Sequence, residues 1–129
     1  MERPNLDGML LATTDPDRLH DWYADVLSPQ DDVDMDGYRV LRLGTFHLLI
    51  DRRDDVAPRA ADPTRMILNV DVDDARAVAA RVDARGTGWL APLEDRDGSL
   101  FGTAVDPDGN HVQIIQLSDE HRAAMTREN

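Results

Sequence analysis

Three polar side chains that can donate or accept protons or hydrogen bonds lie on two short apolar segments. Asn69 and Asp71 belong to the segment 66–72, and Gln113 belongs to the segment 111–117. Both segments have the length and composition of strands, in which alternate residues share a face. A carboxylate that loses contact with water gains basicity, so Asp71 is the candidate catalytic residue, as a general base. It could equally bind a ligand cation or stay solvated at the rim of a site.

Apolar side chains are expected to complete the wall around these polar groups. Leu48 and Ile67 fall on strand positions that we assign to the same cavity face, and Trp89 and Phe101 could stack on a flat ligand. The two aromatic residues could instead be ordinary core or interface residues. An apolar wall with a few oriented polar groups is typical of a small-molecule site.

Composition excludes several kinds of chemistry. The chain has no cysteine, which removes disulfides and thiolates, and its 14 basic residues are all arginine, which removes lysine Schiff bases. A net charge of −12 argues against nucleic-acid binding, which needs a basic face. Ser28, Ser99 and Ser118 lie in predicted loops or caps, without the sharp turn that exposes a nucleophilic serine.

No segment has the roughly 20 consecutive apolar residues that cross a membrane. The N-terminal residues also lack the basic-then-apolar pattern of a secretion signal. We therefore expect a cytoplasmic protein with no membrane partner. Its 129 residues are sufficient for one domain with a single core.

The segment 32–37, Asp-Val-Asp-Met-Asp-Gly, resembles the opening of a calcium-binding loop. The twelfth position of such a loop should be a bidentate glutamate, but here it is Leu43, in a predicted strand. An Asp-rich turn is the favoured interpretation.

The elements that position these residues repeat along the chain. In the first half, a strand at 9–14 precedes a helix capped by Asp15 with Pro16 at its first position. Strands follow at 38–43 and 46–50, with an indistinct one around 33–35. The apolar face of the helix has helical spacing and comprises Leu19, Trp22, Tyr23, Val26 and Leu27.

The second half has the same order of elements. A strand at 66–72 precedes a helix that Asp73 or Asp74 caps and that Gly86 ends. Strands follow at 88–91, 100–105 and 111–117. We predict one domain, 1–129, with module one at about 8–51, a linker at 52–64, module two at about 65–117 and a tail, 118–129, with a helix at 119–127.

Two stretches resemble the vicinal oxygen chelate superfamily, which includes glyoxalases, bleomycin-resistance proteins and extradiol dioxygenases. They are the turn Asp106-Pro107-Asp108-Gly109-Asn110 with the strand after it, and the helix at 15–23 that ends in Trp22-Tyr23. The resemblance covers about residues 8–117. It implies an α+β fold of two βαβββ modules that form a cup-shaped mixed sheet, and it implies a homodimer.

Metal-using members of the superfamily take one ligand from the first and one from the last strand of each module. By distance from Asp15, Asp74 and Gly109, these positions correspond to Gly8, Leu48, Ile67 and Gln113. Three of them have no coordinating side chain, and an amide oxygen is a weak ligand for a transition metal. We expect His47 and His111 to point away from this face. The resemblance therefore predicts a protein without a metal or other cofactor.

Three functions remain open. The first is a glyoxalase/bleomycin-resistance-like protein that lacks the usual metal ligands and binds a small cationic or aromatic molecule in the cup or in a dimer groove. The second is an enzyme of the superfamily, a lyase, isomerase or dioxygenase relative, with an atypical or metal-free site. The third is a relative that shares the fold and acts through a protein interaction.

Overall fold

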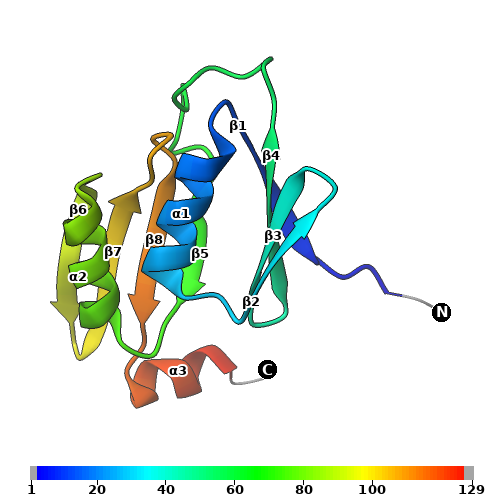
Figure 1. Ribbon diagram of the computed structural model, residues 1–129. Helices are drawn as coiled ribbons and strands as arrows, with labels where there is room; N and C mark the ends of the chain where they lie inside the picture. The colour runs from blue at the N-terminus through cyan, green and yellow to red at the C-terminus, as the bar shows by residue number, and fades with distance from the viewer. Residues whose placement is uncertain (1–2, 127–129) are drawn as a thin grey trace. The chain divides into compact units, whose positions relative to one another are not determined.

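The computed structural model of the protein describes residues 3–126. The chain divides into two compact units, unit 1 at 1–59 and unit 2 at 60–129. Each unit contains a four-stranded mixed sheet, and unit 2 also contains the C-terminal helix (Figure 1). The two units repeat the order strand, helix, strand, strand, strand, which confirms the α+β class and the doubled βαβββ plan.

Unit 1 begins with a strand that returns to pair with the last strand of the unit. Its sheet has the order β1-β4-β3-β2, in which β1 and β4 are parallel and the other pairs are antiparallel. The elements are β1 (Gly8–Thr13), α1 (Pro16–Leu27), β2 (Asp31–Met35), β3 (Tyr38–Leu43) and β4 (Phe46–Arg52).

Helix α1 begins and packs as its sequence predicts. The Asp15 side chain accepts a hydrogen bond from Arg18 N (3.2 Å), which satisfies one of the free donors of the first turn. Its buried residues are Leu19, His20, Trp22, Tyr23 and Val26. The helix packs on β3 and β4, where Leu41, Leu48 and Ile50 are buried.

Unit 2 has the equivalent sheet, in the order β5-β8-β7-β6, with β5 parallel to β8. Helix α2 packs across β6 and β8 (Figure 1). Asp74 caps it, and Gly86 ends it in the left-handed conformation with φ 74°. The elements are β5 (Leu68–Asp71), α2 (Ala75–Arg85), β6 (Trp89–Arg96), β7 (Ser99–Val105), β8 (His111–Gln116) and α3 (Asp119–Thr126).

The turn between β7 and β8 is organised by Asp106. One carboxylate oxygen accepts from the backbone N–H groups of Asp108 and Asn110, both at 2.9 Å, and the other accepts from Asn110 Nδ2 at 2.9 Å. Gly109 takes φ 85°, which a glycine adopts without strain. The turn residues thus determine where β8 begins.

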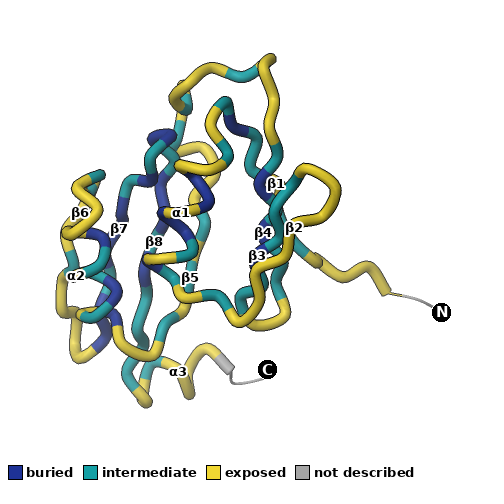
Figure 2. The backbone as a smooth tube through the Cα atoms, viewed as in Figure 1, coloured by how far each residue is buried: buried dark blue, intermediate teal, exposed yellow. Residues whose placement is uncertain are grey.

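Some boundaries differ from the predicted ones. The indistinct strand is regular: β2 covers Asp31–Met35 at the sheet edge and is exposed along its length (Figure 2). The Asp-rich segment is therefore strand and turn, as its missing glutamate indicated. β6 extends to Arg96 with shifts in its pairing to β7. Within the shifted part, the Leu93 backbone lies so close to Gly102 that a Cβ atom there would be 3.0 Å from it.

The boundary between the units, after Arg59, falls inside the predicted linker. The tail helix α3 runs from Asp119 to Thr126, and the residue beyond it that was predicted as helical, Arg127, lies outside the described residues. Among the helices that the structure describes, none is long and apolar enough to cross a membrane.

Candidate functional site

The sheet of unit 2 has one face covered by α2 and another that we call its open face. The pairing register places Asn69 beside Gln113 and Gln113 beside Thr103. One step further along, Asp71 pairs with Ile115, which pairs with Phe101. Because paired residues point to the same side of a sheet, these six side chains share the open face.

A pocket of about 470 Å³ lies on this open face. Three predicted site residues, Asn69, Asp71 and Phe101, line it. Gln113 is not among the lining residues, although it shares their face and pairs with Asn69. The other lining residues are Ile115, Leu117, Arg122 and Met125.

Asp71 is not a desolvated base, because its side chain is exposed, as the rim alternative predicted, and it forms an ion pair with Arg122 of α3. Arg122 Nη1 and Nη2 each donate to one carboxylate oxygen, both at 2.8 Å. The hydrogen bonds and charge of Asp71 raise the pKa of Arg122 above its usual value. Arg122 occupies the bidentate side of the Asp71 carboxylate, so a second forked cation can pair with both oxygens in the same way only after Arg122 moves away.

Trp89 lies on the other side of the sheet from the pocket. Its indole Nε1 donates to Asp83 Oδ1 of α2 at 2.7 Å, and its ring lies close to Gly102. A Cβ atom at Gly102 would be 3.1 Å from the Trp89 ring, so the glycine makes room for it. Trp89 therefore connects α2 to the sheet, which is the structural alternative left open for it. Ile67 is exposed, just before β5 begins.

The structure moves the predicted cavity position of unit 1 by one residue, from Leu48 to Leu49. Leu10 and Asn69 each lie five residues before their helix cap, and their sheet partners are Leu49 and Gln113. Leu48 is completely buried on the helix side. The prediction had matched Gly44 with Gly109, and it was wrong by one residue because the turns that contain these glycines differ in length.

His111 was also assigned to the wrong face. It lies two residues before Gln113 on β8, so the two side chains share the open face. The residue is only 8% exposed, and its Nδ1 atom has no hydrogen-bond partner among residues 3–126. Simple alternation would have found His111. No sequence signal would have found Arg122, because its partner lies 51 residues away.

Unit 1 has its own pocket on the open face of its sheet, of about 350 Å³. Its floor is apolar, and none of its residues was predicted as a site residue. His47 was also predicted to point away from the cavity face, but it lies here with Leu49 and beside Asp7. Its Nδ1 is 3.2 Å from Asp7 Oδ2, an ion-pair distance without hydrogen-bond geometry. The lining residues are Asp7, Asp31, Val33, Met35, Tyr38, Val40, Arg42, His47 and Leu49.

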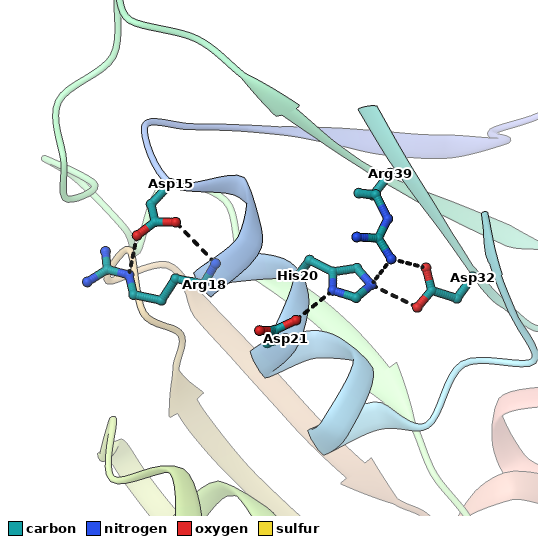
Figure 3. A network of polar contacts seen from close by, with 6 residues as sticks. All are labelled: Asp15, Arg18, His20, Asp21, Asp32 and Arg39. Carbon is teal, nitrogen blue, oxygen red and sulfur yellow. Dashed lines mark hydrogen bonds and ion pairs between the residues drawn. The ribbon is translucent and has the colours of Figure 1, made fainter. Parts of the chain in front are cut away.

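On the helix side of unit 1, a polar network joins α1 to β2 and β3 (Figure 3). His20 Nε2 lies 2.8 Å from Asp32 Oδ2 and 2.9 Å from Arg39 Nη2, and its Nδ1 lies 3.0 Å from Asp21 Oδ1. Burial acts to raise the pKa of Asp32, but hydrogen bonds from His20 and Arg39 outweigh it and lower that pKa. The network connects elements within unit 1 and faces away from its pocket.

The chain thus contains two modules with the same βαβββ plan, and the sheet of each module has an open face. A family model described as a glyoxalase-like domain matches residues 8–115. The chain therefore belongs to the glyoxalase-like family of the vicinal oxygen chelate superfamily.

Solved structures share the fold. A glyoxalase/bleomycin resistance protein/dioxygenase family enzyme from Burkholderia phytofirmans PsJN has a TM-score of 0.71 at 16% identity, over 89% of this chain and 100% of that one. A glyoxalase/bleomycin resistance protein from Albidiferax ferrireducens T118 has a TM-score of 0.70 at 17% identity, over 87% and 98%. TioX from Micromonospora sp. ML1 has a TM-score of 0.64 at 23% identity, over 88% and 98%. No curated protein matches the chain in sequence.

The positions that correspond to metal ligands in the superfamily do not suit a transition metal here. With the corrected register they are Gly8, Leu49, Ile67 and Gln113. A Cβ atom at Gly8 would lie 2.1 Å from the backbone oxygen of His47, so no side chain fits there while β1 and β4 stay paired. Only Gln113 could offer a ligand atom, and a neutral amide is a poor donor to such metals.

Proposed function

We propose that this protein binds a small organic molecule with a cationic or aromatic group in the pocket of unit 2, as a glyoxalase/bleomycin-resistance-like protein that uses no catalytic metal. The observation that carries the proposal is the pocket of about 470 Å³ in which Phe101, Ile115 and Leu117 lie beside Asn69 and Asp71. Volumes of roughly 300–1,000 Å³ with apolar walls and a few polar groups are typical of ligand sites.

Each part of this pocket has a chemical counterpart in such a ligand. Phe101 and Ile115 offer apolar area, and burying such area contributes about 25 cal/mol per Å². Asn69 offers both a donor and an acceptor. Asp71 offers a negative charge, and the net charge of −12 favours the approach of a cation.

A thermal-shift screen with aromatic and cationic small molecules tests the proposal, because a ligand that binds only the folded state raises its stability. At 100 times the dissociation constant the gain is about 2.7 kcal/mol. We expect stabilisation by aromatic cations, and we expect it to fall in Phe101→Ala. If a broad panel gives no shift, the protein-interaction alternative gains weight.

Elemental analysis of the purified protein tests the metal-free part. We expect no stoichiometric transition metal. One equivalent of bound metal that disappears in Gln113→Ala would overturn this part of the proposal.

A homodimer is also part of the proposal, as the resemblance implies. Light scattering at micromolar concentration should give twice the mass of the chain. A monomer mass would remove the dimer groove as a binding site.

A second candidate function is an enzyme, and His111 favours it. His111 is a buried imidazole with a nitrogen that has no partner among residues 3–126, on the open face beside Gln113. It does not line the pocket, so it can move a proton only on a substrate that extends beyond the pocket toward Gln113. Such a protein would be an isomerase, lyase or dioxygenase relative. If this candidate holds, His111→Gln should abolish turnover of a ligand found in the screen while the ligand still stabilises the protein. Equal turnover in both proteins would exclude His111 as the base.

A further inference from the structure

We propose, on the basis of the function proposed above, that Arg122 is a built-in competitor of the ligand. The proposed ligand has an aromatic body and a planar cationic group, either an amidinium or a guanidinium. In the free protein, the Arg122 guanidinium occupies the position at Asp71 that this cationic group would take. Binding then exchanges one bidentate ion pair for another, and α3 acts as a strap across the pocket.

The first turn of α3 is held in place from β7. Ser118 N donates to Ser99 Oγ at 2.8 Å, and the Ser99 hydroxyl also hydrogen-bonds to His121 Nδ1. Ser99 is completely buried. Ser118 caps the helix through its side chain, which accepts from His121 N at 3.1 Å, and its backbone oxygen accepts from Arg122 N at 2.9 Å. The backbone of Arg122 is therefore held in place, next to His121, whose side chain is hydrogen-bonded to Ser99.

The ion pair of Arg122 is well formed but easily replaced. Its two hydrogen bonds have the fork geometry that guanidinium and carboxylate prefer. The side chains of Arg122 and Asp71 are 47% and 52% exposed, and exposed ion pairs of this kind change an equilibrium by only a few-fold. After release, the Arg122 guanidinium can return to water.

The pocket favours a planar forked cation over a compact ammonium. Both Asp71 oxygens already point at one fork, and an amidinium presents the same two parallel N–H donors. Replacing the guanidinium of Arg122 by the amidinium of the ligand should therefore change the binding free energy little. The net gain must then come from the body of the ligand, against Phe101, Ile115 and Leu117.

Titration calorimetry at low salt with benzamidine tests the inference, with uncharged benzamide as the matched neutral probe. Arg122→Gln removes the competitor and should tighten benzamidine binding by roughly two- to five-fold, the size expected for an exposed ion pair. Asp71→Asn removes both forks, so it should change benzamidine affinity little in the wild-type background and should abolish the gain from Arg122→Gln in the double variant. Benzamide should bind all variants equally.

Arg76→Gln is the control for net charge. Arg76 is an exposed residue of α2, the helix on the other face of the sheet, and its loss changes the charge by the same amount. It should leave benzamidine affinity unchanged. In wild-type protein, the Arg122 Nε–H resonance should move to its solvent-exposed position when benzamidine is added. Circular dichroism verifies that each variant is folded.

The outcomes separate this inference from the proposed function. If aromatic probes bind but Arg122→Gln weakens or does not change benzamidine affinity, the competitor role is wrong and the binding function stands. The same holds if Arg76→Gln tightens binding as much as Arg122→Gln. If neither probe binds any folded variant, both proposals fall.

Discussion

The open faces of the two units carry different chemistry on the same backbone plan. At the equivalent paired positions, unit 1 has Leu10 and Leu49, whereas unit 2 has Asn69 and Gln113. Leu10 is 51% exposed, an apolar side chain that its own unit leaves uncovered. The duplicated plan therefore determines where a site can form, and the individual side chains determine which of the two faces can form hydrogen bonds.

The helix sides differ in the polar contacts that accompany their apolar cores. In unit 1 a network of charged groups around His20 connects α1 to its sheet. In unit 2 the contact of α2 is mostly apolar, through Ala75, Val78 and Val82, with hydrogen bonds from Trp89 Nε1 to Asp83 and from Ala75 N to Gln116 Oε1. Both units thus have an apolar core between helix and sheet, and unit 1 adds a charged network to it. In unit 2, Asp71 carries the charge to which we assign a binding role.

The largest expected effect is at the close approach of β1 and β4 in unit 1. Gly8→Ala would place a Cβ atom 2.1 Å from the His47 backbone oxygen, which only a shift of the strand can relieve. We expect a loss of about 3 kcal/mol or more in unfolding free energy, the upper range for overpacking. Urea denaturation measures it. Ile67→Ala, at the equivalent position of unit 2, should cost under about 1 kcal/mol because Ile67 is already exposed; equal losses would contradict the difference between the units.

The next effect is at the turn before the last strand of unit 2. Asp106→Ala removes the acceptor of two backbone donors and one side-chain donor. We expect about 2–3 kcal/mol of destabilisation, because buried donors would lose a charged partner. In unit 1 the equivalent turn contains the exposed Thr45, and Thr45→Ala should change stability by less than about 0.5 kcal/mol. Similar values for the two variants would show that Asp106 does not specify the turn.

A smaller effect, on ligand affinity, should differ between residues on the two faces of the unit 2 sheet. Phe101→Ala removes an aromatic wall of the pocket and should weaken an aromatic ligand about ten-fold, or about 1.4 kcal/mol. Trp89→Phe removes a hydrogen bond on the helix side and should leave the affinity unchanged. Calorimetric titration of both variants decides between them. If the Trp89 variant binds the ligand more weakly than the Phe101 variant does, the ligand binds on the helix side of the sheet and the proposed site is wrong.

The smallest effect concerns acid stability and belongs to unit 1. Asp32 has a lowered pKa in the folded protein, so the unfolded chain binds its proton more readily. The stabilisation is complete above the unfolded pKa, near the reference value of 3.8, and it is lost as the pH falls through the lower folded pKa. Asp32→Asn should therefore flatten the fall in stability below about pH 4 and cost about 1 kcal/mol or less at pH 7.

Asp34→Asn is the matched control for that measurement. Asp34 lies on the same edge strand and is exposed. Denaturation series from pH 2.5 to 7 should give the wild-type profile for this variant. A flattened profile in Asp34→Asn as well would assign the effect to overall charge.

Local sequence signals predicted most of the fold correctly. Asp15 and Asp74 cap their helices, Gly86 ends α2, and the Asp106 turn precedes β8. These signals act over a few residues, which is why they can be read without the structure. The boundaries of β2 and β6 were less accurate, because β2 has only two apolar residues, Val33 and Met35, to show alternation, and a bulge in β6 breaks it.

The sequence by itself determined the doubled plan, the family and the face shared by Asn69, Asp71 and Gln113, because caps, turns and strand alternation are local properties of the chain. The tertiary structure decided the rest. It paired Asp71 with Arg122 across 51 residues, placed Trp89 on the helix side, and corrected Leu48 to Leu49 through the strand register. Such contacts depend on how distant segments pack, and that information is not contained in any single stretch of residues.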